Sequence, residues 1–207
     1  MPWCPGKPSG RREKRTTLDP IQRPLQLTAW YLLSRHEAPR SKILRVPIVQ
    51  LDRSKAATVV AEGTDTIVGS FWEAPSVLPT ENRLYLLYQR GGTSKIRVFD
   101  LDGKPQPTPR QLAVAAADGL TPIRDDEVPF ANWFFVEPPA FFRYGGTGEE
   151  TTKTALAARS PVDLSRVRVV REMATSNDGT RVPVNILLPR GRSASSPGPC
   201  VVNGHGG

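Results

Sequence analysis

One two-part segment occurs twice in this sequence, and the spacing between its copies restricts the possible folds. The tripeptide Tyr-Leu-Leu at 31–33 returns at 85–87, an offset of 54 residues, and Ser-Lys-Ile at 41–43 returns at 94–96, an offset of 53. Each copy contains two short apolar runs. A polar connection with a proline separates them in the first copy, and Gly91-Gly92 is predicted to turn the chain between them in the second. This pattern predicts two antiparallel β-strands in each copy.

Repeats of about 50 residues built from short antiparallel strands are typical of β-propeller blades. A looser third copy is predicted, with strands at 133–136 and 140–144. A single blade cannot bury both of its faces, so blades stack on their neighbours. Three blades are too few for a ring of the usual size, so the chain is either a propeller that lacks N-terminal blades or an open sandwich. The alternative to a true repeat is two hairpins that are similar by chance.

A second region follows a boundary near Ser160-Pro161. The sequence predicts a strand at 167–173, a hairpin turn at 176–179 that ends in Asp-Gly, and a return strand at 182–188. Pro183 cannot donate a hydrogen bond to a neighbouring strand, which predicts an edge position or a bulge there. A buried apolar strand is expected at 200–203, followed by Gly204, His205, Gly206 and Gly207.

The segment His205-Gly206-Gly207 is the one motif in the sequence that carries chemistry. An apolar strand followed by His-Gly-Gly leads into the oxyanion hole of many α/β-hydrolases. Glycine lets the backbone approach closely, and N–H groups can then point at the negative charge that develops on the carbonyl oxygen. His205, Gly206 and Gly207 are therefore candidate oxyanion-hole residues. The alternative is a glycine-rich stretch with an exposed histidine.

No nucleophile accompanies this motif in the sequence. There is no G-x-S-x-G elbow, and the nearest segment, Gly-Arg-Ser-Ala-Ser at 191–195, lacks the second glycine. His36, the other histidine, is predicted to be a solvated turn residue. Cys4 and Cys200 lack the spacing of a zinc site or a disulfide framework, so no metal site is expected. We therefore expect no catalytic residues within the chain.

The net charge of +8 is concentrated near the N-terminus. Residues 1–30 supply +4 of it, from six basic and two acidic residues. Such a stretch is typical of a nucleic-acid-binding arm or of a disordered leader. Aromatic residues do not alternate with the basic ones, as a base-stacking platform would require, so nucleic acid is the disfavoured partner. No apolar run approaches the roughly 18 residues of a membrane span, so no membrane association is expected.

Several segments resemble the prolyl oligopeptidase family of serine peptidases, and they follow the family's order. In chain order they are 31–45, 97–103, 135–144, 160–163, the strand from 167 to Arg171-Glu172, and 176–184. The first three are similar to propeller blades of the family, and the last three to the return of its chain into the hydrolase domain. The resemblance implies a mainly β fold, in which the last blades of a partial β-propeller precede the first strands of an α/β-hydrolase domain.

This resemblance implies three parts of the chain. Residues 1–27 are expected to be a basic, disordered leader, residues 28–158 a partial β-propeller, and residues 159–207 the N-terminal strands of a truncated α/β-hydrolase domain. In the family, a seven-bladed propeller caps the hydrolase domain and restricts access to short peptides. The partners expected for the parent enzyme are therefore short peptides.

The resemblance also implies a reaction, the hydrolysis of short peptides after proline by a Ser/Asp/His triad that needs no cofactor. The triad of the family lies after the point that Gly207 occupies, so we expect the chain to be a fragment that is inactive alone. The family's Gly-Tyr-Gly-Gly aligns with 204–207, so His205 replaces a tyrosine whose hydroxyl helps to hold the oxyanion. An imidazole N–H is a donor of different reach and protonation. The expected location is the cytoplasm, and the alternative function is a non-catalytic β-propeller binding module.

Overall fold

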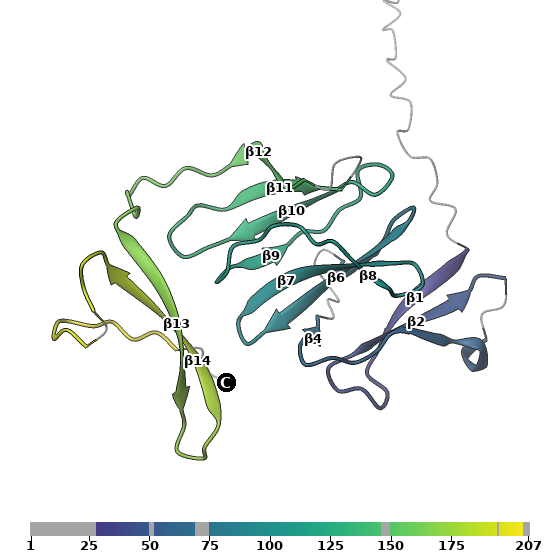
Figure 1. The fold of residues 1–207 in the computed structure, drawn as a ribbon, viewed down its shortest axis with the longest axis horizontal. Helices are drawn as coiled ribbons and strands as arrows, with labels where there is room; N and C mark the ends of the chain where they lie inside the picture. Colours follow the sequence, from purple (N-terminus) through teal and green to yellow (C-terminus); the bar gives the residue numbers. More distant parts are fainter. Residues whose placement is uncertain (1–27, 50–51, 69–74, 146–149, 194, 205–207) are drawn as a thin grey trace, which may run out of the picture.

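The computed structural model describes residues 28–49, 52–68, 75–145, 150–193 and 195–204. The leader expected at 1–27 lies outside this part of the chain. The described residues form fourteen β-strands and one 3-10 turn, and no α-helix occurs among them. The strands make three stacked antiparallel sheets and a separate hairpin (Figure 1). The mainly β fold predicted from the sequence is confirmed.

The three sheets follow one another along the chain. The first sheet has the order β1-β2-β3 and contains β1 (Ala29–Ser34), β2 (Lys42–Pro47) and β3 (Ala57–Val60), with the 3-10 turn η1 (Arg53–Lys55) before β3. The second sheet has the order β4-β6-β7-β8, with β5 also paired to β6, and contains β4 (Thr66–Ile67), β5 (Val77–Pro79), β6 (Arg83–Arg90), β7 (Thr93–Asp100) and β8 (Pro105–Gln106). The third sheet has the order β12-β11-β10-β9 and contains β9 (Ala116–Asp118), β10 (Val128–Trp133), β11 (Ala140–Tyr144) and β12 (Thr152–Ala157).

The sequence repeat is a repeat of strand register. Leu33 pairs with Ile43 between β1 and β2, and Leu87 pairs with Ile96 between β6 and β7. The first pair packs between the first and second sheets, and the second pair packs between the second and third. Each copy therefore presents the same face to the sheet that follows it. Stacking in one direction is how propeller blades bury their faces.

The second sheet is buried on both faces because apolar residues occupy successive positions of β6. Side chains alternate between the two faces of a strand. Leu84, Leu86 and Tyr88 accordingly pack toward the first sheet, whereas Tyr85 and Leu87 pack toward the third. Burying one such side chain contributes about 2 kcal/mol to the free energy of unfolding. Continuous apolar runs, not an alternating pattern, therefore mark this middle sheet.

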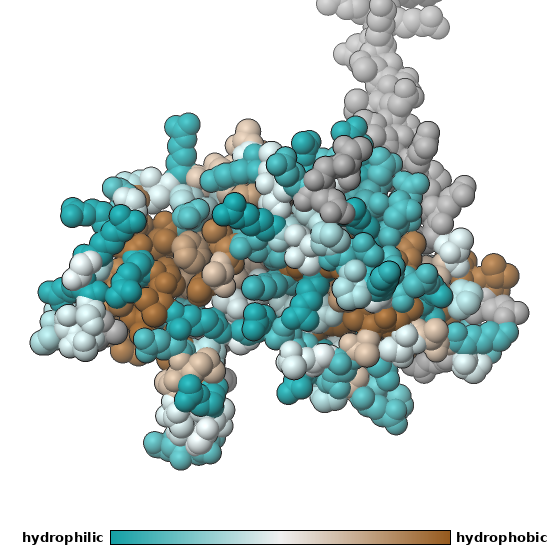
Figure 2. Space-filling model, in the orientation of Figure 1, coloured by the Kyte–Doolittle hydropathy of each residue, from teal (hydrophilic) through white to brown (hydrophobic). Residues whose placement is uncertain are grey.

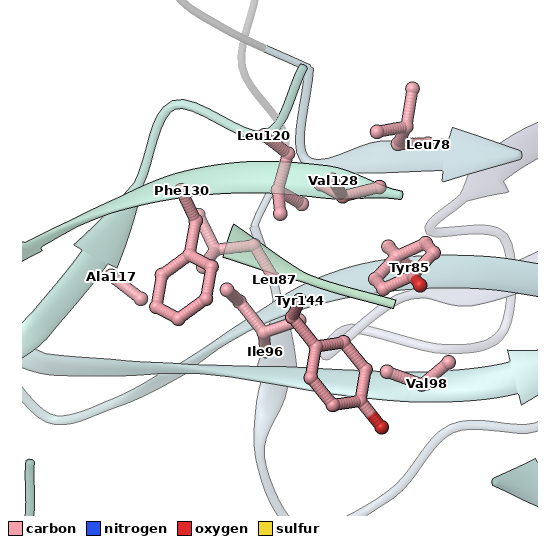
Figure 3. Packing of buried hydrophobic residues seen from close by; sticks show 10 residues of the cluster. All are labelled: Leu78, Tyr85, Leu87, Ile96, Val98, Ala117, Leu120, Val128, Phe130 and Tyr144. Atoms are coloured by element: carbon pink, nitrogen blue, oxygen red, sulfur yellow. The ribbon is translucent and has the colours of Figure 1, made fainter. Parts of the chain in front are cut away.

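Aliphatic and aromatic side chains pack together between the second and third sheets (Figure 3). The rings of Tyr85 and Tyr144 meet edge to face, with their centroids 6.4 Å apart. Phe130 and Phe142 stack with centroids 5.8 Å apart. The Tyr144 hydroxyl donates a 2.6 Å hydrogen bond to the Pro107 carbonyl oxygen. The tyrosines thus pack in an apolar layer and satisfy their hydroxyl groups at its margin.

A hairpin follows the third sheet and consists of β13 (Val167–Thr175) and β14 (Arg181–Pro189). Its turn at 176–179 includes Gly179 at φ 84°, as predicted from the Asp-Gly sequence. Within the described residues, the two strands pair only with each other. Pro183 pairs with Met173 without a break in register, so the predicted edge position is confirmed and no bulge forms.

Two strand predictions are wrong. The third repeat was expected to begin with a strand at 133–136, but β10 ends at Trp133 and the chain then crosses to β11. The aromatic residues there lie in the connection, where the rings of Phe134 and Phe135 meet at 6.4 Å. The buried strand expected at 200–203 does not form, and Val201 is 96% exposed. An apolar run becomes a buried strand only where neighbouring strands pair with it and cover it.

Candidate functional site

The turn between β6 and β7 is where the three-sheet body contacts the β13–β14 hairpin. Gly91 and Gly92 form this two-residue turn, at φ 58° and 92°. Positive φ at both positions is what a tight hairpin with right-handed twist requires, and glycine adopts it without steric cost. The predicted Gly-Gly turn is therefore confirmed. The carbonyl oxygens of Arg90 and Gly91 accept hydrogen bonds from another part of the chain.

Arg171 of β13 binds these carbonyl groups. Its Nη2 donates a 2.9 Å hydrogen bond to the Arg90 carbonyl oxygen and a second hydrogen bond to the Gly91 carbonyl oxygen. Its Nη1 donates a 3.3 Å hydrogen bond to Asn185 Oδ1, and Asn185 is the partner of Arg171 in the β13–β14 register. The planar guanidinium group thus joins both strands of one hairpin to the turn of another.

Pro183 completes this contact on the apolar side. A Cβ atom added to Gly91 would lie 3.2 Å from Pro183 Cγ, whereas one added to Gly92 would have no heavy atom within 4 Å. The proline ring therefore packs over Gly91 and not over its neighbour. We call Arg171, Pro183, Arg90 and Gly91 the hairpin contact.

An ionic cluster holds the strands beneath this turn in place. The side chain of Asp65 is only 13% exposed and pairs with two arginines. Arg90 Nε lies 3.3 Å from Asp65 Oδ1, and Arg97 binds the other carboxylate oxygen. The Arg97 guanidinium also lies 4.2 Å from the centroid of the Tyr88 ring. Burial raises the pKa of Tyr88, so the ring stays neutral and packs beneath the cation.

A groove lies beside the turn, between the second and third sheets. Its lining includes Val68, Leu87, Gln89, Ala117 and Trp133. At its base, the Ser94 hydroxyl donates a 2.7 Å hydrogen bond to the Ala117 carbonyl oxygen and accepts a 2.8 Å hydrogen bond from the Ala117 N–H. The serine thereby joins the two sheets where no direct strand pair connects them. The groove combines apolar side chains with the amide group of Gln89 and the half-exposed indole ring of Trp133.

Asp126 links the second and third sheets at the end opposite the β6–β7 turn. It accepts hydrogen bonds from the Thr80 hydroxyl at 2.7 Å and from the Asn82 N–H at 2.8 Å. The Tyr85 hydroxyl donates a 2.7 Å bond to the Asp126 carbonyl oxygen. Burial by itself would raise the pKa of Asp126, but these hydrogen bonds and the nearby Arg83 hold it below its ordinary value. Burial also raises the pKa of Tyr85 to about 12.

The residues predicted to carry chemistry are not brought into this site. His205, Gly206 and Gly207 lie outside the described residues. Ser193 and Ser195 are exposed, and their hydroxyl oxygens lie 2.7 Å from each other. His36 is exposed in the turn between β1 and β2, as predicted. Among the described residues, no group of three or more His, Cys, Asp or Glu side chains is placed to hold a metal ion.

The hairpin contact was not identified from the sequence. Arg171 is one of three charged residues in the strand predicted at 167–173, so its type alone did not mark it, and the Gly-Gly turn was recognised only as a turn. Nothing local to either segment says that they meet, because they are 80 residues apart. No helix among the described residues has the length and apolar character needed to cross a membrane.

Comparison with known proteins identifies related sequences and folds. The family model for the N-terminal β-propeller domain of prolyl oligopeptidase matches residues 19–156. No curated protein matches the sequence. A prolyl endopeptidase studied for inter-domain dynamics in catalysis and specificity has a similar solved structure, with a TM-score of 0.68 and 23% identity over 80% of this chain and 24% of that chain.

Two further solved structures show the same similarity. Oligopeptidase B from Leishmania major has a TM-score of 0.63 and 16% identity, over 84% of this chain and 25% of that chain. Prolyl oligopeptidase B from Galerina marginata, bound to a 35mer hydrolysis and macrocyclization substrate, has a TM-score of 0.62 and 15% identity, over 80% of this chain and 23% of that chain. The chain therefore spans about a quarter of the length of these solved proteins.

Proposed function

Because this chain belongs to the prolyl oligopeptidase family, matched through its N-terminal β-propeller domain, we propose that it forms the part of a peptidase that covers the active site. In this proposal, residues 28–158 are propeller blades. Residues 159–207 are the first strands of the α/β-hydrolase domain, and residues 1–27 are a basic leader outside both. The parent protein would hydrolyse short peptides on the carboxyl side of proline, in the cytoplasm.

The hairpin contact is the observation that carries this proposal. A covering domain must be attached to the domain that it covers. Attachment at a turn at one end of a sheet leaves the rest of the sheet stack free of that contact. Arg171 makes such an attachment, because it joins the first strand after the third sheet to the Arg90 and Gly91 carbonyl groups. The groove next to the same turn supplies an apolar wall where a peptide entering from that side would pass.

The proposed chemistry needs groups beyond those in this sequence. Acyl transfer to a serine requires a nucleophile, a base beside it and a group that orients the base. The 207 residues contain no G-x-S-x-G elbow. We therefore propose that they do not hydrolyse peptides alone. His205, Gly206 and Gly207 would contribute donors to the oxyanion hole, with an imidazole N–H in place of the family's tyrosine hydroxyl.

A peptidase assay tests this function. The native protein, captured from its own cells with an antibody against residues 28–158, is given a fluorogenic octapeptide that contains one proline. The matched substrate carries alanine at that position, and a third substrate carries the same octapeptide within a folded protein. The proposal predicts cleavage of the first substrate only. The isolated 207-residue chain should cleave none of the three.

The alternative, a non-catalytic β-propeller binding module, has a different outcome in the same assay. If the captured native protein cleaves none of the substrates, the peptidase proposal is wrong. If it cleaves the proline and alanine peptides equally well, the family assignment stands and the proposed preference for proline is wrong.

A further inference from the structure

A pocket lies along the edge of β7, in the second sheet. Its volume of about 490 Å³ is within the range of sites that bind small molecules. All of its lining residues belong to the segment 90–111. The first and third sheets cover the two faces of this sheet, so the pocket lies in a completed part of the stack. Figure 2 shows mostly hydrophilic side chains over the middle of the visible face, where Figure 1 places β7 and β8.

The amide side chain of Gln111 fixes one wall of this pocket. The neighbouring strand β8 has only two residues, which pair with Val98 and Phe99 of β7. Further along β7, the side chain of Gln111 takes the place of a strand. Its Oε1 accepts a 2.7 Å hydrogen bond from the Ile96 N–H, and its Nε2 donates a 3.0 Å hydrogen bond to the Ile96 carbonyl oxygen. The edge of β7 is thereby satisfied, and the segment after β8 is held against it.

The pocket collects positive charge. Arg90, Lys95 and Arg97 all line it, and none of its lining residues is acidic. Lys95 pairs with Tyr88 in the register of β6 and β7, so alternation places the three cations on one face of the sheet. Long side chains reach their diagonal neighbours at this spacing. The carboxylate of Asp65 pairs with both arginines, so one negative charge stands against three positive ones and leaves a net charge of +2.

Two of these cations have donor groups without an acceptor among the described residues. Lys95 is half-buried, and its ammonium group makes no hydrogen bond or ion pair with any described residue. The Nε of Arg90 lies 3.3 Å from Asp65 Oδ1, and its two Nη groups make no hydrogen bond with a described residue. A partly buried charge without a partner costs free energy that a bound anion would recover.

We propose that this pocket binds a phosphate dianion, carried either by a small phosphorylated compound or by a phosphorylated side chain of a peptide. The net charge of +2 matches a dianion, whereas a single carboxylate would balance only half of it. Arginine and lysine are the usual phosphate-binding side chains. Gln106 and Thr108 line the same pocket and supply neutral hydrogen-bond donors. This binding site is separate from the proposed peptidase function and does not rest on it.

Isothermal titration calorimetry of the 207-residue chain with inorganic phosphate measures the binding. The titration is made near pH 8, at which phosphate is a dianion, and chloride keeps the ionic strength constant. Acetate, a monoanion, is the reference ligand. The proposal predicts saturable binding of one phosphate per chain, at least about tenfold tighter than acetate. Absence of saturable phosphate binding overturns the proposal, and equal affinities for phosphate and acetate overturn the selectivity for a dianion.

Two lysine substitutions locate the bound phosphate. Lys95→Gln removes a cation from the pocket and should weaken phosphate binding by at least about tenfold. Lys104→Gln is the control, because Lys104 is exposed in the turn between β7 and β8 and does not line the pocket. It removes the same charge and should change the affinity by less than about twofold. Equal losses in the two variants would mean diffuse attraction to a basic chain and would overturn the site. Circular dichroism checks that both variants keep their strands.

A phosphoserine peptide and its unphosphorylated counterpart distinguish the two sources of phosphate. Tighter binding of the phosphoserine peptide than of inorganic phosphate identifies a phosphorylated side chain as the ligand. Binding of inorganic phosphate without any gain from the peptide identifies a small phosphorylated compound. Both outcomes support a phosphate site, provided that Lys95→Gln weakens them. Equal binding of the unphosphorylated peptide would contradict it.

Discussion

Arg171 and Gly91 lie 80 residues apart in the sequence, yet the Arg171 guanidinium donates a hydrogen bond to the Gly91 carbonyl oxygen. This contact joins the first strand after the sheet stack to the central hairpin of the stack. Pro183 packs against the same glycine, so the contact has a polar and an apolar part.

The two turn glycines allow a matched test of the hairpin contact. Both have positive φ, so alanine strains the backbone at either position by about 1 kcal/mol. Only at Gly91 does the new Cβ atom also meet Pro183, at 3.2 Å. Gly91→Ala should therefore speed amide hydrogen exchange in β13 and β14 by roughly tenfold relative to Gly92→Ala, equivalent to about 1.4 kcal/mol. Equal exchange in the two variants would mean that Pro183 does not pack on the turn.

Replacing Arg171 tests the polar part of the same contact. Arg171→Gln removes the charged donor to the Arg90 and Gly91 carbonyl groups. We expect a loss of about 1 kcal/mol in the stability of hairpin docking, because the group is partly exposed. Hydrogen exchange in β14 should report this loss. Arg168→Gln is the control, since Arg168 lies in the same strand and donates to the Arg192 carbonyl oxygen, away from the turn. A larger effect of the control substitution would contradict the assignment.

Because the middle sheet is buried, alanine substitutions at two leucines should differ strongly in their effect on the free energy of unfolding. Leu86 is fully buried between the first and second sheets, whereas Leu156 is 69% exposed on the third. Leu86→Ala should lower the free energy of unfolding by about 2–5 kcal/mol, through lost burial and the cavity that remains. Leu156→Ala should change it by less than about 0.5 kcal/mol. Urea denaturation followed by circular dichroism measures both values. Similar losses would mean that the middle sheet is not covered on that face.

The network around Asp126 predicts a dependence of stability on pH. The pKa of this carboxyl group is lower in the folded chain than its ordinary value of 3.8. Its ionised form therefore stabilises the fold fully above that ordinary value, and the contribution is lost as the pH falls through the folded value. Asp126→Asn should lower the urea midpoint at pH 7, and the difference from the unchanged chain should shrink below about pH 3.8. A difference that stays constant from pH 7 to pH 3 would contradict the role of the ionised carboxylate.

The repeat made much of the fold predictable from the sequence. Leu33 and Leu87 lie in short apolar runs bounded by turn residues, and each pairs in the register that the repeat implies. The short strands β4, β5, β8 and β9 were not predicted, because two or three residues carry no periodic pattern. The strand predicted at 133–136 was wrong for a different reason. Its aromatic residues favour a strand by composition, but they pack against each other in a connection.

The candidate site was less predictable than the fold. The sequence indicated the Gly-Gly turn and the β13–β14 hairpin separately, and each formed as expected. Their contact depends on the path of the whole chain between them, which no local pattern encodes. The same is true of Asp126, whose partners Thr80 and Asn82 lie more than 40 residues earlier. Polar residues in turns show no periodicity that would link them.

The intact mass of the native protein in its own cells, together with its labelling by a fluorophosphonate probe, tests the central claim most directly. The probe reacts with the activated serine of a triad, so it reports the chemistry that these 207 residues lack. The account predicts that an antibody against residues 28–158 captures a labelled protein heavier than 22.7 kDa, and that the isolated 207-residue chain is not labelled. An unlabelled native protein of 22.7 kDa would contradict the claim that this chain serves as part of a peptidase.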